Sequence, residues 1–175
     1  APSVRYKILV TESSHLDTGF TDPQDQVSDI RIRILDDVIR FIDEEKDPDY
    51  HFTEEGMWSV QQYLEARSPE KIERLMQLAR EGRIELAVMN SSISAWTTGD
   101  EELCREVERA KRIQDRFGIP LKSACFIDTP GVGWGLAEVL HRAGIRYLVN
   151  GMNESFNGRS FETSLPREFW WETPS

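Results

Sequence analysis

Apolar runs that suit β-strands alternate along this chain with stretches whose apolar residues recur every three or four positions, as on the buried face of a helix. Parallel neighbours in a sheet need a long return connection, and a helix between two strands supplies it. The alternation therefore predicts an α/β fold with a mostly parallel sheet and right-handed crossovers. The expected strands lie at residues 4–10, 50–53, 84–89, 123–127 and 146–149.

The expected helices fall between and after these strands, at residues 27–42, 57–66, 69–81, 103–117 and 134–143. Ser68 is expected to cap the third helix, with Pro69 at its first position, where a missing N–H costs nothing. Gly82 and Gly118 are expected to end the third and fourth helices, because glycine adopts the left-handed conformation that closes a helix. Gly144 is expected to end the fifth helix.

Composition narrows the class of protein. The 175 residues carry a formal net charge of −10, and 39% of them are apolar, which suits a single globular domain at residues 1–175. No run of Lys and Arg stands free of compensating acids, so no nucleic-acid partner is expected. No apolar stretch approaches the roughly 20 residues of a bilayer span, so no membrane partner is expected either. Cys104 and Cys125 form no disulfide framework and do not fix the compartment.

The end of the chain is dense in aromatic residues: Phe156, Phe161, Phe169, Trp170 and Trp171. A solvated tail would not carry so many, so they either belong to the core or an edge strand, or form a stacking wall for a sugar ring. Residues 169–174 look like a strand entering a turn whose continuation is absent. We therefore expect the chain to be an incomplete fragment of a larger domain.

His15 and Asp17 directly follow the first expected strand. In extended chain, residues two apart point to the same side, so an imidazole nitrogen and a carboxylate oxygen could reach one metal ion. The alternative is a purely structural pair. Their place favours a site, because β/α folds assemble their sites at the carboxyl ends of the strands.

Asp128 ends the buried strand at residues 123–127 and is expected at the same rim as His15 and Asp17. The alternative is that Asp128 caps the next helix, a common use of aspartate. Thr129 competes for that position, with Pro130 at a favoured first helical position. That arrangement would leave Asp128 free to face the crevice.

Other acids near the expected rim have simpler explanations. Thr98 and Glu101 fit a capping box, and Asp100 suits the positive end of the helix that follows. Glu54 and Glu55 also lie at the rim, and at least one of them is expected to be a solvated surface acid. The remaining histidines have no neighbouring ligand pattern and are expected to be structural or exposed: His51 and His141.

Three segments carry a resemblance to a known family: HLDTGFTDP at residues 15–23, GRIELAVMNSSISAWTTGDE at 82–101 and IDTPGVGWGLAEVLHRAGI at 127–145. Together, and in this order, the chain resembles the N-terminal catalytic domain of the glycoside hydrolase family 38 α-mannosidases. The segments span most of the chain. The resemblance implies the N-terminal portion of a seven-stranded β/α barrel that holds one zinc ion.

The resemblance also implies roles for individual residues. His15 and Asp17 would be zinc ligands, and Asp128 would be both a zinc ligand and the catalytic nucleophile. Phe20 would stack beneath the sugar, and Trp96, in the second matching segment, is the other expected substrate-binding residue. The family's fourth ligand, a second histidine, and its general acid would come from sequence beyond the chain end. The chain departs from the family at residues 129–132, which read TPGV where a Phe-Gly-His sequence is usual.

The resulting hypothesis is a zinc-dependent retaining glycosidase that acts on α-mannoside-like carbohydrate, with activity in the intact protein and an inactive fragment that binds metal weakly or not at all. Glu54 and Glu55 are geometric guesses for the general acid. One alternative is a metal-dependent polysaccharide deacetylase. The other is a noncatalytic fragment whose unpaired sheet edges bind a partner chain or a second copy, which would make a homo-oligomer.

Overall fold

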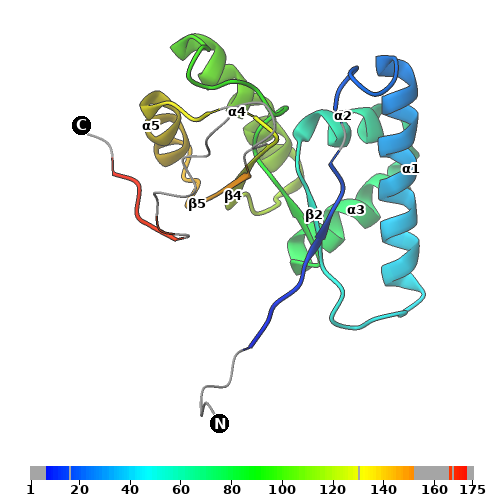
Figure 1. Ribbon diagram of the computed structural model, residues 1–175. Helices are drawn as coiled ribbons and strands as arrows, with labels where there is room; N and C mark the ends of the chain where they lie inside the picture. Colours follow the sequence, from blue (N-terminus) through cyan, green and yellow to red (C-terminus); the bar gives the residue numbers. More distant parts are fainter. Residues whose placement is uncertain (1–6, 16, 130, 152–165, 167, 173–175) are drawn as a thin grey trace.

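The computed structural model describes residues 7–15, 17–129, 131–151, 166 and 168–172 (Figure 1). Strands β1 (Glu12–Ser13), β2 (Phe52–Glu54) and β3 (Ile84–Leu86) pair in parallel and in chain order. Strands β4 (Ser123–Ile127) and β5 (Tyr147–Gly151) form a second parallel pair. The amide of Val88 donates to the carbonyl of Ser123 at 2.9 Å, which joins the segment after β3 to the start of β4.

The helices connect the strands as the alternation predicts: α1 (Gln24–Asp43), α2 (Met57–Ala66), α3 (Pro69–Glu81), α4 (Asp100–Phe117) and α5 (Trp134–Arg142). Helix α1 packs against α2, α3 against β3, and α4 against α5. In Figure 1, α1 to α3 lie on one side of the molecule and α5 on the other. Gly82 and Gly118 close α3 and α4 with φ of 76° and 62°, as predicted. No helix in the described ranges is long and apolar enough to cross a membrane.

The core lies between the helices and the strands. Leu35 of α1, Tyr63 of α2 and Leu75 of α3 are fully buried. The central residues of β4, from Ala124 to Phe126, are also buried, so both faces of this strand are covered. The prediction of a buried fourth strand at residues 123–127 is confirmed, since parallel strands covered on both faces have continuous apolar sequences.

The prediction of a first strand at residues 4–10 is wrong for its described part. Residues 7–11 form no strand, and the side chains of Ile8, Leu9 and Val10 are at least 80% exposed. The strand is instead Glu12–Ser13, whose sheet neighbour among the described residues is β2. The apolar run has no layer over it in the described chain, whereas Glu12 lies beside His51 and its amide donates to the His51 carbonyl at 3.2 Å.

Two helices lack the caps that the sequence suggested, although α5 begins at Trp134, as predicted. Helix α5 begins at Trp134 behind Gly133, so neither Asp128 nor Thr129 caps it. Helix α4 begins behind Gly99, and the hydroxyl of Thr98 donates to the Ser94 carbonyl at 2.9 Å instead of forming a capping box with Glu101. In both places the loop before the helix is held by other contacts. Ser68 is the N-cap residue of α3, as predicted, but its side chain makes no capping hydrogen bond.

The described residues contain the five strands above, so the fold is mixed α/β with parallel strands, and a seven-stranded barrel is not shown. Near the end of the chain, residues 169–172 form no strand, contrary to prediction. Trp171 is half-buried and its ring centroid lies 5.9 Å from that of Trp134, whereas Phe169 and Trp170 are exposed. Phe156 and Phe161 lie outside the described residues.

Candidate active site

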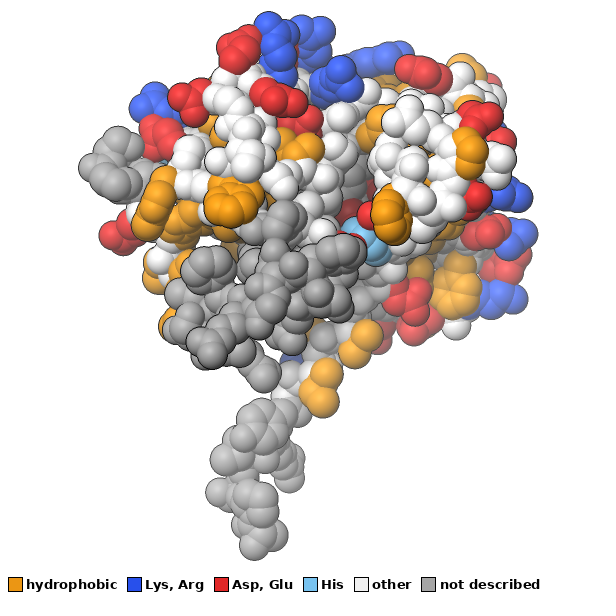
Figure 2. Space-filling view, turned by 45° about the horizontal axis from the view of Figure 1, so that its top comes forward, with side chains coloured by type: hydrophobic (Ala, Val, Ile, Leu, Met, Phe, Trp, Pro, Cys, Tyr) orange, Lys and Arg blue, Asp and Glu red, His pale blue; other side chains and the backbone are white. Residues whose placement is uncertain are grey.

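The carboxyl ends of the parallel strands meet at a pocket of about 320 Å³. Its walls come from the segments that follow β1, β2, β3 and β4, so residues from distant parts of the sequence face one space. In Figure 2 a histidine side chain lies at the edge of a recess in which acidic side chains are visible. Parallel strands bring this about, because all their carboxyl ends reach the same rim.

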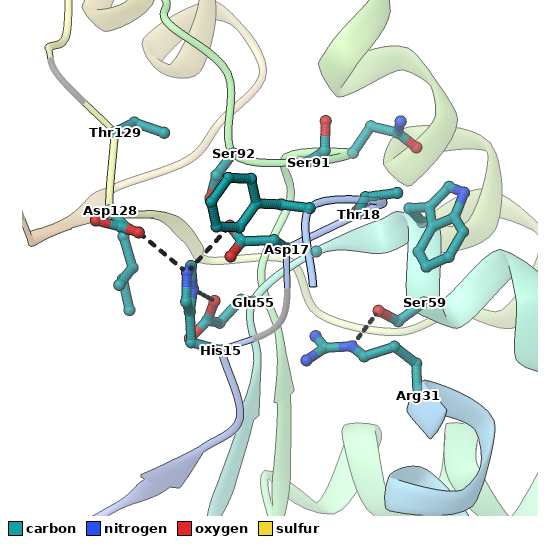
Figure 3. A pocket seen from close by; sticks show the side chains of 15 residues that line it. His15, Asp17, Thr18, Arg31, Glu55, Ser59, Ser91, Ser92, Asp128 and Thr129 are labelled. Atoms are coloured by element: carbon teal, nitrogen blue, oxygen red, sulfur yellow. Dashed lines mark hydrogen bonds and ion pairs between the residues drawn. The ribbon is translucent and has the colours of Figure 1, made fainter. Parts of the chain in front are cut away.

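His15, Asp17 and Asp128 lie together in this pocket (Figure 3). Nε2 of His15 is 3.7 Å from Oδ1 of Asp17 and 3.8 Å from Oδ2 of Asp128. One donor atom from each residue lies within 4.8 Å of the other two. The side chains are about one-third exposed, which leaves them open to a ligand from solvent.

The donor set fits a divalent metal ion. One imidazole nitrogen and two carboxylate oxygens are ligands that zinc accepts, and three protein ligands leave a position open for substrate or water. Oδ1 of Asp128 is buried without a hydrogen-bond partner among the described residues. A buried polar atom without a partner is costly, and a bound cation would satisfy it. Among the described residues, these three form the cluster that suits a metal.

Asp128 has an unusual backbone conformation. Its φ is 61°, in the left-handed region that few residues other than glycine enter, although aspartate does so more readily than most. Its amide donates to the carbonyl of Gly151 at 2.7 Å, so the end of β5 holds the residue in place. Such conformations cost about 1 kcal/mol or more and concentrate at functional sites. Because α5 begins only at Trp134, capping does not explain this aspartate.

Glu55 lies on the other side of His15. Its Oε2 is 2.9 Å from Nδ1 of His15, and its Oε1 accepts a bond from the hydroxyl of Ser13 at 3.4 Å. The Glu55 side chain is 8% exposed. The prediction that Glu54 or Glu55 would be a solvated surface acid is therefore wrong, because both are buried. Sequence spacing could not reveal the contact, since it joins the segments that follow two different strands.

Glu54 does not line the pocket and pairs with a buried arginine, Arg31, that does. Arg31 of α1 pairs with the Glu54 carboxylate, donates to the Ser14 carbonyl and, through Nε, donates to the Ser59 hydroxyl at 2.7 Å. Burial raises the pKa of Glu54, and the charge of Arg31 beside it opposes that rise. Sequence reasoning missed Arg31, although it stands four residues after Val27, on the buried face of α1. The arginine connects α1, β2 and α2 to the residue before His15.

The two predicted substrate-binding aromatic residues lie in different places. Phe20 lines the pocket and its side chain is 82% exposed. Trp96 is 65% exposed and does not line the pocket. Its ring lies against Gly131, where an added Cβ would be 3.7 Å from ring atoms, so Trp96 covers the loop that follows Asp128. Part of the polar lining comes from three residues of the segment 82–101 that sequence reasoning did not name as site residues: Asn90, Ser91 and Ser92.

The other histidines lie away from the pocket. Both are exposed, as predicted, and Nδ1 of His51 is 2.7 Å from the Asp49 carbonyl. His141 lies in the last turn of α5. Neither belongs to the metal-capable cluster.

Comparisons with known proteins agree with this architecture. The model of the family described as the glycosyl hydrolases family 38 N-terminal domain matches residues 5–175. An α-mannosidase from Enterococcus faecalis V583 is similar in structure, with 21% identity and a TM-score of 0.67 over 79% of this chain and 16% of that chain. A glycosyl hydrolase family 38 protein from Enterococcus faecalis is similar at 20% identity and a TM-score of 0.64, over 80% of this chain and 16% of that chain.

At these identities the structural similarity shows the fold, and the chain spans 16% of the length of both structures. No curated protein matches the sequence. The family match covers nearly the whole chain and agrees with the resemblance that the three sequence segments indicate. The chain belongs to the glycosyl hydrolase family 38 N-terminal domain family.

Proposed function

We propose that this chain supplies the nucleophile and most of the metal site of a zinc-dependent retaining glycosidase that acts on α-mannoside-like carbohydrate. The observation that supports this most is the approach of His15, Asp17 and Asp128 to within 4.8 Å in one pocket. Family membership supports glycoside hydrolysis as the reaction. The α-mannosidase among the similar structures supports the substrate class.

His15, Asp17 and Asp128 would hold the metal, which when bound supplies positive charge that polarises sugar oxygens. We assign the nucleophile to Asp128. Its carboxylate would form a bond to the anomeric carbon as the bond to the leaving oxygen breaks, and a general acid would give that oxygen a proton. Water would then hydrolyse the glycosyl ester, with the same acid acting as a base. Asp128 suits this role because its side chain lines the pocket and is 30% exposed.

Neither Glu54 nor Glu55 suits the role of general acid. Glu54 is 1% exposed and paired with Arg31, and Glu55 is within hydrogen-bond distance of His15. A general acid must reach the leaving oxygen and exchange its proton with solvent. In keeping with the family resemblance, we propose that the acid and a fourth metal ligand come from another part of the intact protein. The exposed Phe20 ring and Trp96 remain our candidates for contact with the sugar.

The experiment is an assay of the intact protein with nitrophenyl α-mannoside, before and after zinc removal. We expect activity that is lost with the metal and restored by zinc. Asp128→Asn should reduce turnover by about 10³-fold or more, since the nucleophile is gone, and should leave part of the sugar binding intact. The matched control is Asp115→Asn, which changes an exposed aspartate of α4 and should leave turnover unchanged. Undiminished turnover in Asp128→Asn would refute the nucleophile, and release of acetate from an acetylated sugar would favour a deacetylase.

A further inference from the structure

The two ring nitrogens of His15 face different groups (Figure 3). Nδ1 lies 2.9 Å from Oε2 of Glu55, whereas Nε2 faces the carboxylates of Asp17 and Asp128 at 3.7 and 3.8 Å. The Glu55 side chain is 8% exposed and His15 is 32% exposed, so the first contact is the sheltered one. The two nitrogens therefore have different environments.

A carboxylate oxygen accepts hydrogen bonds, so the contact with Glu55 favours a proton on Nδ1 of His15. In a neutral imidazole that leaves Nε2 with a free lone pair, which is the form that binds a metal ion. Glu55 is itself held, because the hydroxyl of Ser13 donates to its other oxygen at 3.4 Å. The carboxylate can then fix the angle of the ring as well as its tautomer.

The backbone carbonyl of Ser14, the residue before His15, is held by a separate contact. Arg31 donates to the carbonyl of Ser14 while it pairs with Glu54, the residue before Glu55. Successive residues of an extended strand point to opposite faces, so the two adjacent acids act on the same segment from different sides. Glu54 acts through the arginine on the backbone, and Glu55 acts directly on the ring.

We propose that Glu55 is a positioning residue that holds His15 with its proton on Nδ1, so that Nε2 is directed at Asp17 and Asp128 and is ready to bind a metal ion. The identity of the metal ion rests on the proposed function. The position of the proton on the His15 ring does not. Removal of a carboxylate that orients a metal-binding histidine typically weakens metal affinity by about 10–100-fold.

The first test is nitrogen NMR of the metal-free full-length protein at pH 8, with only its histidines labelled with ¹⁵N. The His15 signals are those that disappear in His15→Gln. In the neutral ring we expect the proton on Nδ1 in wild type, a mixture of both tautomers in Glu55→Ala, and the wild-type tautomer in Glu55→Gln, which retains an acceptor through its amide oxygen. A neutral wild-type ring with its proton on Nε2 would overturn the proposal, as would an unchanged tautomer in Glu55→Ala.

The second test is zinc affinity by competition with a chelating dye. We expect Glu55→Ala to bind zinc about 10–100-fold more weakly than wild type, with Glu55→Gln between the two. The matched control is Glu85→Ala, which removes an acid that accepts a bond from the Ser123 hydroxyl at 2.6 Å, away from His15, and which should leave zinc affinity unchanged. Equal affinity in wild type and Glu55→Ala would contradict the proposal. Absence of zinc binding in wild type would instead refute the proposed metal site, and the NMR result would still decide the role of Glu55.

Discussion

Nε2 of His15 and Oδ2 of Asp128 lie 3.8 Å apart, although one residue follows the first strand of the described chain and the other follows the fourth. Each stands just beyond the carboxyl end of a parallel strand, and Asp17 completes the group from the same segment as His15. The pocket lining includes the acids Asp17, Glu55 and Asp128 and the base Arg31, so its net negative charge would attract a cation. The Glu55 contact would leave one nitrogen of the His15 ring to bind that cation.

Replacement of His15 by alanine tests the metal site. We expect zinc affinity of the full-length protein to fall by at least about 100-fold, because a directly bound ligand contributes more than an orienting group does. The measurement is competition with a chelating dye. His141→Ala, which removes an exposed histidine of α5, should keep wild-type affinity. Equal affinity in His15→Ala and His141→Ala would exclude His15 as a ligand.

Replacement of Arg31 by methionine tests the buried pair. It leaves the Glu54 carboxylate, which is 1% exposed, without its charge partner, and we expect unfolding free energy to fall by about 3–5 kcal/mol. Urea unfolding measures this change. The double variant Arg31→Met with Glu54→Leu should recover most of the loss, because no buried charge remains. A single variant within about 1 kcal/mol of wild type would show that the pair does not hold α1 to β2.

Asp36 makes stability depend on pH. Burial disfavours its ionised form, but hydrogen bonds from Arg67, Lys71 and Tyr63 outweigh that effect and hold its pKa below the usual value. A lowered pKa in the folded state means that the stabilisation is complete above the unfolded pKa of about 3.9 and is lost as the pH falls through the folded pKa.

We therefore expect Asp36→Asn to unfold more easily than wild type at pH 7, by about 1–2 kcal/mol, since Asp36 is about one-quarter exposed and its charged hydrogen bonds are partly screened by solvent. The difference should shrink as the pH falls below about 4. Urea unfolding of both proteins at several pH values measures it. A difference that stays constant down to pH 3 would contradict this account of Asp36.

The two cysteines should differ in reactivity. Cys125 is 4% exposed, and burial together with the charges of Glu55 and Glu54 raises its pKa to about 12. Cys104 lies exposed in α4. Because the thiolate is the reactive form, iodoacetamide at pH 8 should modify Cys104 in the folded protein and Cys125 only after unfolding. Peptide mass spectrometry after a short reaction tests this, and rapid modification of folded Cys125 would contradict the packing around β4.

Much of the fold could be predicted from the sequence because periodic apolar patterns report local structure. Helix α2 and strand β4 have the predicted bounds, and Gly82 and Gly118 end their helices as expected. The first strand could not be placed, because an apolar run such as residues 8–10 becomes a strand only if another layer covers it. Helix α5 begins at Trp134, as predicted, but the close packing of Gly133 against Trp96, where an added Cβ would lie 3.2 Å from Trp96 Cα, joins distant segments and could not be predicted.

The candidate site also has a part that could be predicted from the sequence and a part that could not. His15, Asp17 and Asp128 could be singled out because each follows an apolar run that predicts a strand. The contacts of Glu55 with His15, and of Arg31 with Ser14 and Glu54, join separate elements and leave no spacing pattern in the sequence. These contacts depend on strand register and helix packing, which only the folded chain shows.

Anomalous X-ray diffraction at the zinc edge, from crystals of the full-length protein with zinc, tests the central claim most directly. We predict a single strong peak in this pocket, within about 2.2 Å of Nε2 of His15 and of a carboxylate oxygen from each of Asp17 and Asp128. A zinc peak bound elsewhere, with these three side chains free of metal, would contradict it.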